Sequence, residues 1–171
     1  MNNETAETPH DSIFVKMVLS AWQTQNARVD QLLGKLTDEQ LSAETAPGRN
    51  TGIYLLGHFA ATNDRLLALL DVGERLHPEL DEIFLDSPDK SGKQMPSIDE
   101  LKKYWMEIND KLTSHFNKMQ PAGWFMKHAA ISEEDFAKEP HRNKLSVLIT
   151  RAIHQGYHLG QMNYLRAQKN S

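Results

Sequence analysis

Residues 52–70, GIYLLGHFAATNDRLLALL, form the most apolar helical segment of the chain and indicate its fold. Asn50 or Thr51 can cap the start of a helix here, and Gly73 follows its expected end near Asp71. The first half of this segment is apolar almost all round, as in a helix that packs deeply against several others. The stretch therefore predicts a central helix of a helical bundle.

Three further segments repeat apolar residues at the 3.6-residue period of an amphipathic helix. Ser97 and Glu100 have the spacing of a capping box at the start of one of them. In the first segment, the stripe that contains Met17 and Trp22 is expected to face the core. The approximate ranges of the three helices are 8–33, with Thr8 as the N-cap, 97–120 and 143–168.

Two long connections, residues 72–97 and 120–143, separate these helices and are too long for simple turns. A short helix is expected to begin at Ser132 within the second connection, and a short capped turn at Thr37. The sequence has no sustained alternation of β-branched and polar residues, so strands are not expected. We therefore predict a single all-α domain spanning residues 1–171, a four-helix bundle with long connections and a short extra helix.

The composition limits the kinds of partner and chemistry. The chain has 19 Lys and Arg against 23 Asp and Glu, a formal net charge of −4, so nucleic acid is not an expected partner. It has no cysteine, which excludes disulfides, thiolate metal sites and a cysteine nucleophile. The uncharged residues 50–63 are too few to span a bilayer, and the N-terminus MNNETAETPHD is too polar and acidic for a signal peptide. We expect a cytoplasmic protein without a membrane partner.

Three of the eight histidines stand out because they lie in apolar helical segments. His154 and His158 are four residues apart in RAIHQGYHLGQMNYLR, residues 151–166, so both imidazoles lie on one face of a helix. His58 lies in the most apolar part of the second helix. A lone buried histidine is more often a hydrogen-bonded core residue than a metal ligand. Three imidazoles on two apolar helices, with no cysteine available, are instead well served by a shared divalent ion.

Other assignments of these residues fit less well. Gln155 stands where a zinc protease of the His-Glu-x-x-His type has its glutamate. A carboxylate-bridged di-iron bundle needs Glu-x-x-His on two helices, and the only instance here, Glu74 to His77, lies in a connection. No Gly-x-Ser-x-Gly sequence supports a serine nucleophile. The remaining histidines are interpreted as exposed or locally hydrogen-bonded side chains: His10, His77, His115, His128 and His141.

The chain resembles the DinB-like superfamily, the damage-inducible and bacillithiol-transferase-like proteins. The resemblance rests on GIYLLGHFAATNDRLLALL around His58 and on AIHQGYHLGQMNYLR near the end, and it covers essentially the whole chain. It implies an up-down-down-up four-helix bundle, often a homodimer. It also implies a divalent ion, usually nickel or zinc, with His58, His154 and His158 as its ligands. Some members resemble thiol-dependent transferases, but the resemblance does not imply a substrate.

Three neutral imidazoles would leave such an ion its full charge and open coordination positions, as in catalytic zinc sites. A bound water or thiol would then lose its proton more easily, and because the chain lacks cysteine, a reacting thiol would be a small molecule. We expect a metal-dependent transferase or hydrolase that acts on a small-molecule substrate.

Two alternatives stay open. The first is a non-catalytic, metal-stabilised dimeric bundle with a stress-related binding role, and the second is DNA binding, which the negative charge disfavours. Gln161, Tyr157 and Arg65 share helix faces with the three histidines. Gln161 could orient a ligand, Tyr157 could reach the site, and Arg65 could receive an anionic group. Each of them also has an ordinary structural interpretation.

Overall fold

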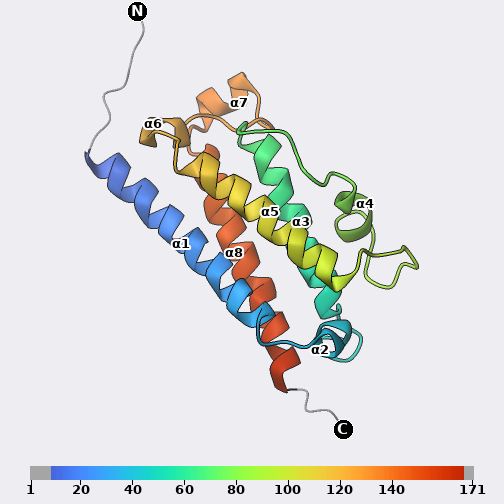
Figure 1. Cartoon of the computed structure of the whole chain (residues 1–171). Coiled ribbons are helices and arrows are strands. Elements are labelled where there is room, and N and C mark those ends of the chain that lie inside the picture. The colour runs from blue at the N-terminus through green and yellow to red at the C-terminus, as the bar shows by residue number, and fades with distance from the viewer. Residues whose placement is uncertain (1–8, 168–171) are drawn as a thin grey trace, which may run out of the picture.

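Four long helices form the body of the molecule (Figure 1). The structure is a computed structural model that describes residues 9–167. The long helices are α1 (Pro9–Leu33), α3 (Gly52–Leu69), α5 (Ile98–Phe116) and α8 (Lys144–Met162). The short ones are α2 (Asp38–Ser42), α4 (Leu80–Phe84), α6 (Pro121–Trp124), α7 (Glu133–Lys138) and a 3₁₀ helix, η1 (Asn163–Ala167). Residues 9–167 contain no strand, so the predicted all-α bundle is confirmed.

Side-chain caps start most of the predicted helices at the expected residues. The Thr51 hydroxyl accepts from the Tyr54 N–H at the start of α3, and Asn143 accepts from the Ser146 N–H at the start of α8. The capping box of Ser97 at α5 is present, as are the predicted caps of α2 and α7. The predicted cap Thr8 lies outside the described residues. These polar groups satisfy N–H donors that have no partner within a helix.

One predicted helix end was wrong, and a second helix changes type shortly before its predicted end. The helix expected over residues 97–120 ends at Phe116, and Pro121 begins the separate turn α6, because proline is tolerated in the first turn of a helix. The α-helical hydrogen bonding of α8 ends at Met162, and η1 continues the chain to Ala167. The short helix α4 within residues 72–97 was not predicted.

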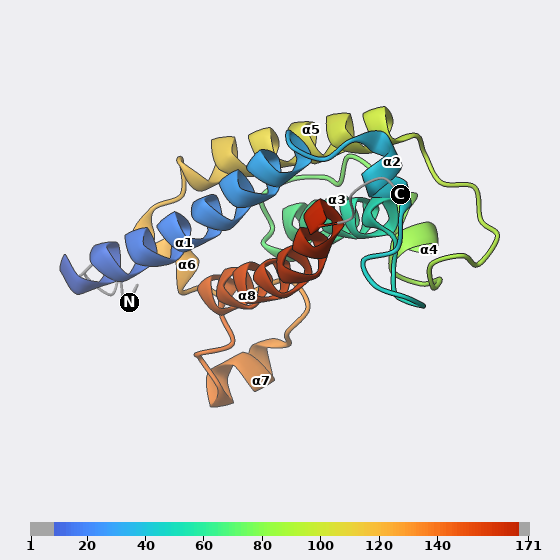
Figure 2. The ribbon, with the colours of Figure 1, turned by 90° about the horizontal axis from the view of Figure 1, so that it is seen from below.

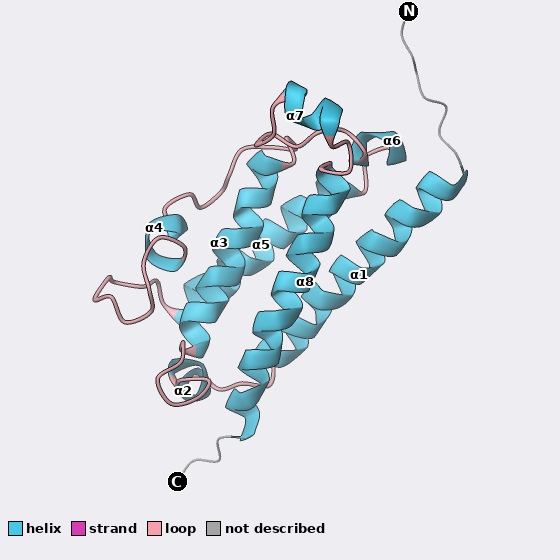
Figure 3. Cartoon of the chain, turned by 180° about the vertical axis from the view of Figure 1, so that it is seen from behind, coloured by secondary structure: helices cyan, strands magenta, loops and turns pink. Residues whose placement is uncertain are grey.

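The long helices form two layers, which can be followed in three views. Figure 2 shows α1 and α5 on one side of the bundle and α3 and α8 on the other, and Figure 3 shows α3 and α8 from behind. Within the described residues, α1 and α8 run in one direction, and α3 and α5 run in the other (Figure 1). The connection between α3 and α5 therefore returns along the length of the bundle, and α4 lies on this return path beside α3.

Large aromatic and aliphatic side chains fill the space between the layers. Trp22, Trp105, Trp124 and Phe59 are almost fully buried. The predicted core stripe of α1 was wrong in part, because the apolar surface of this helix is wider than the side that faces the bundle. Val15, Val18 and Trp22 point inward, whereas Ile13, Phe14 and Met17 are 57%, 47% and 63% exposed.

A chain of amide hydrogen bonds crosses the core and connects all four long helices. Asn109 of α5 accepts from the side-chain amides of Asn26 and Asn63 at 3.1 and 2.9 Å. Gln155 of α8 donates to Asn26 at 2.7 Å. We call these four residues the amide network. None of the described helices has the length and apolar character that a membrane crossing requires.

Candidate metal centre

The three histidines singled out in the sequence meet between α3 and α8. The Nε2 atom of His154 lies 3.2 Å from Nε2 of His58 and 3.1 Å from Nε2 of His158. All three side chains are half-buried. In residues 9–167 they form the one group of three or more histidine, aspartate or glutamate side chains whose ligand atoms are close enough to hold a metal ion.

The spacing of these nitrogens fits a first-row divalent ion. A metal–nitrogen distance of about 2.0–2.1 Å separates two ligand nitrogens by roughly 3.3 Å in a tetrahedral site. In an octahedral site, the same bond length gives about 2.9 Å between neighbouring ligands. The observed 3.1–3.2 Å lies between these two values. His154 can therefore share one ion with His58 and with His158 at these spacings, and the ligand atoms of all three rings lie within 4.8 Å of one another.

The second nitrogen of two rings determines which atom faces the centre. Nδ1 of His58 lies 2.9 Å from the backbone carbonyl of Phe84, and because a carbonyl only accepts, this nitrogen carries the proton. Nδ1 of His158 lies 2.8 Å from Oε1 of Gln161, which assigns it the same tautomer. The Nε2 lone pairs of both rings then point toward the shared centre. A cation between them removes their mutual repulsion, as expected for histidine ligands whose other nitrogen is hydrogen-bonded.

The close contact between α3 and α4 positions the first of these rings. A Cβ atom at Gly57 would lie 2.3 Å from two ring carbons of Phe84, so only glycine leaves room for that ring. The Tyr54 hydroxyl donates to the carbonyl of Ser87 at 2.7 Å and also contacts the Phe84 carbonyl at 3.4 Å. The Phe84 carbonyl is thus held where it accepts from His58.

Burial favours the neutral form of His58 and His154, which is the form that metal binding requires. Burial lowers the pKa of His58, and the hydrogen bond to the Phe84 carbonyl opposes this change. The charges of His158 and Arg151 lower the pKa of His58 further. Burial also lowers the pKa of His154 to about 4, with further contributions from His158, His58 and Arg151. Protons therefore compete weakly for His58 and His154 near neutral pH.

Arg151 is a cationic residue next to this centre that sequence reasoning missed. It lies three residues before His154 on α8 and is largely buried, and burial lowers its pKa to about 10, with a contribution from Arg65. Its Nε has no hydrogen-bond partner, and among the described residues it has no carboxylate partner. Arg65, which the sequence analysis considered, pairs with Asp81 at 2.9 Å. The signal for Arg151 was the spacing Arg-x-x-His-x-x-x-His, which places all three side chains on one helix face.

The other two residues considered lie at the edge of the histidine cluster. Gln161 bonds His158, as described above, and its amide nitrogen lies 3.4 Å from the Tyr157 hydroxyl. Tyr157 itself is 65% exposed. Gln161 therefore positions a ligand ring, and Tyr157 lies on the solvent side of it.

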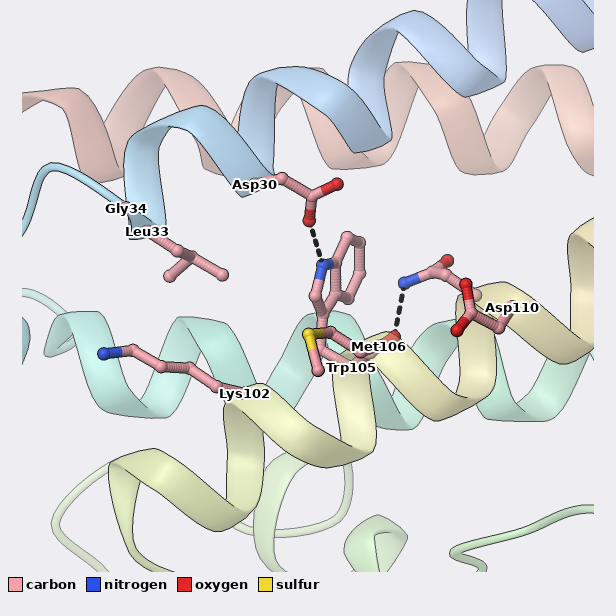
Figure 4. Close-up of a pocket in the computed structure, with 8 residues that line it drawn as sticks. Asp30, Leu33, Gly34, Lys102, Trp105, Met106 and Asp110 are labelled. Carbon is pink, nitrogen blue, oxygen red and sulfur yellow. Dashed lines mark hydrogen bonds between the residues drawn. The ribbon is translucent and has the colours of Figure 1, made fainter.

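A separate groove lies away from the histidines. It has a volume of about 500 Å³, and Figure 4 shows it between α1 and α5, the layer that faces away from α3 and α8. There, Asp30 accepts from the Trp105 indole N–H at 2.7 Å, and Met106, Lys102 and Asp110 lie at the wall. These side chains do not converge on a common point as the histidines do. The histidine cluster is therefore the stronger candidate site.

Comparisons with known proteins agree with this architecture. The chain is similar in structure to a protein described as the conserved protein of a locus from Enterococcus faecalis, with a TM-score of 0.59 and 15% identity. The match covers 90% of this chain and 97% of that one, and it shows a shared fold. No curated protein matches the chain. A family model of the DinB superfamily matches residues 21–162. The histidine-bearing helices both lie inside that match, and the chain belongs to the DinB superfamily.

Proposed function

We propose that the protein binds one divalent metal ion through His58, His154 and His158 and uses it in a reaction on a small molecule. The position of His154 supports this most directly, because its Nε2 lies 3.2 Å from that of His58 and 3.1 Å from that of His158. A site with three protein ligands leaves a position for substrate, unlike the four-ligand sites that serve structure alone. The side chains are half-buried, so a small molecule can approach them from solvent.

When bound, the ion supplies Lewis-acid chemistry, because it lowers the pKa of a coordinated water or thiol. The chain contains no cysteine, so a thiol in the reaction comes from a small molecule. The reaction class is thus a thiol transfer or a hydrolysis. We propose nickel or zinc as the ion, since imidazole nitrogen suits both.

The protein's own residues hold the site rather than take part in covalent steps. Phe84 and Gln161 orient two of the rings through their Nδ1 atoms. Burial keeps His154 neutral, so it is ready to bind a cation near neutral pH.

Metal titration and turnover test the proposal together. The wild-type protein should bind one zinc or nickel ion per chain, and H58A, H154A and H158A should each lose most of this affinity. H128A is the matched control, because His128 lies outside the cluster. The metal-loaded protein should consume a small thiol with an electrophile or cleave a simple ester, and chelation should stop this. Metal binding without any such turnover would favour a non-catalytic role.

That second role has one observation in its favour, an exposed apolar face on α1 and α8. Ile13, Met17 and Ile153 are 57%, 63% and 69% exposed, and a shallow groove of about 260 Å³ runs between the two helices at this face. Monomers rarely expose contiguous apolar surface of this kind. We propose that two copies of the chain associate here, whether or not the protein is an enzyme.

The oligomeric state tests this association. Sedimentation of the wild-type protein should show a dimer, and M17K or I153K should give a folded monomer. Lys103→Glu, an exposed change on α5, is the control. A monomeric wild-type protein would refute the dimer and leave the metal centre unaffected.

A further inference from the structure

Arg151 differs from the other largely buried arginine in the absence of an acidic partner. Arg75 bonds Asp64 at 2.9 Å and Asp81 at 2.7 Å, which compensates its charge. Within residues 9–167, Arg151 has no ion pair, and its Nε is buried without a hydrogen-bond partner. A partly buried cation without a counter-ion is costly, so its retention points to a use.

The position of this side chain indicates what that use is. Arg151 precedes His154 by three residues on α8, and its charge contributes to the lowered pKa values of His58 and His154. Arg151 therefore lies close to His58 of α3 and to His154 of α8. Nδ1 of His154 is also buried and has no partner. When Nε2 of that ring binds an ion, Nδ1 carries a proton, so two buried N–H donors beside the centre lack acceptors.

Arg151 gives the surroundings of the cluster a positive charge that no carboxylate of the described residues compensates. Arg65 lies close enough to lower the pKa of Arg151, and Arg65 is itself paired with Asp81. A divalent ion at the histidines would add two more positive charges. A molecule that carries a negative group would relieve this repulsion and supply acceptors for the unpaired donors.

We propose that Arg151 binds an anionic group, a carboxylate or a phosphate, of the small molecule that reaches the histidine cluster. This proposal rests on the proposed function, and it adds that the substrate carries a negative group. The planar guanidinium can form two parallel hydrogen bonds to either group, and such charge-assisted bonds are strong. The bound anion then lies beside the three histidines, with the rest of the molecule directed toward them.

Calorimetric titration with inorganic phosphate and with acetate tests the anion site. Both are titrated into wild-type protein, R151Q and R151K, each in the zinc-loaded and the zinc-free form. R28Q is the matched control, because Arg28 is an exposed arginine of α1 and the substitution changes the net charge equally. R151Q should weaken anion binding about tenfold or more, and R28Q should leave it unchanged. R151K should lie between, because lysine keeps the charge but not the two-pronged geometry. Preference for one anion identifies the group.

A second measurement uses only the wild-type protein. Phenylglyoxal modifies accessible arginines, and peptide mass spectrometry reports the extent at Arg151. Phosphate should protect Arg151 from modification and leave Arg28 unprotected. This result is independent of whether R151Q folds.

The two proposals fail in different ways. Zinc titration of R151Q should show an affinity at least as high as that of wild type, because a positive charge has been removed from beside the ion. Absence of zinc binding in wild type would refute the metal centre, while the zinc-free titrations would still decide the role of Arg151. Anion binding by R151Q equal to wild type, or no protection of Arg151, would overturn the anion site and leave the metal centre standing.

Discussion

Substitution of Gly57 by alanine tests whether the contact between α3 and α4 holds the metal centre in place. The added Cβ would lie 2.3 Å from Cε1 and from Cζ of Phe84. Phe84 is fully buried, and its carbonyl accepts from His58. The ring therefore cannot move aside without shifting the backbone that orients this ligand.

Two opposing effects set the magnitude. Alanine is favoured over glycine inside a helix by about 1 kcal/mol. Overpacking of a buried contact costs roughly 1–3 kcal/mol, and the short distances here place Gly57→Ala toward the upper end. We expect a net loss of about 1–2 kcal/mol, which lowers the melting temperature by roughly 2–8 °C for a chain of this size. Loss of the bond that orients His58 should also weaken metal binding by about 10–100-fold.

Gly160→Ala is the matched control on α8. A Cβ at Gly160 would have no atom within 4 Å, so this variant should gain about 1 kcal/mol from helix propensity alone. Urea unfolding gives the stability of each variant, and zinc competition with a chromophoric chelator gives its metal affinity. If Gly57→Ala were as stable as Gly160→Ala and bound zinc like wild type, the contact would not position the ligand.

Three further predictions follow from the same site. Gln161→Ala should lower zinc affinity about 10–100-fold in chelator competition, because it removes the partner of His158. The melting temperature of the metal-free protein should stay nearly unchanged, because the other contact that is lost, to the Tyr157 hydroxyl, is exposed. Equal zinc affinity would show that the bond to His158 is dispensable. The metal-free protein should lose about 1–3 kcal/mol of stability as the pH falls from about 6.5 to about 4. The reason is that a histidine in the unfolded chain takes up a proton near pH 6.5, whereas the pKa of folded His154 is about 4. Urea unfolding across this pH range measures the loss, and His154→Asn should make the stability less dependent on pH. Arg151→Met should raise the free energy of unfolding of the metal-free protein by about 1 kcal/mol or more, because it removes an uncompensated buried cation; a less stable variant in the same assay would mean that the guanidinium contributes to packing.

Local patterns in the sequence were sufficient to predict the four long helices and to single out the three histidines. Caps such as Ser97 act within four residues, so their signal survives without tertiary information. His154 and His158 lie one turn apart, and helix geometry alone places them on one face. Their meeting with His58, 96 residues from His154 in sequence, could be inferred only because both helices are apolar enough to be neighbours in the core.

The surroundings of the site could not be predicted in the same way. The helix α4 has five residues, too few for a helical period to show, and the group it contributes is a backbone carbonyl that no residue type announces. Arg65 and Arg151 look equally suited to receive an anion when only the sequence is read. The difference arises because Asp81, on the returning connection, pairs with Arg65 and not with Arg151. Such pairing depends on how distant segments pack, which periodicity and capping do not encode.

The amide network explains how helices from two layers keep these imidazoles aligned. Gln155 is adjacent to His154, and Asn63 lies five residues after His58, so the network and the metal centre share α3 and α8. Sliding a helix by one residue moves it about 1.5 Å and turns each side chain by about 100°, which would break the amide bonds and direct a ligand away from the centre. Apolar packing tolerates such shifts better than buried hydrogen bonds do, because an unpaired buried amide is costly. The polar residues in the core therefore select the one helix register in which three imidazole nitrogens face each other.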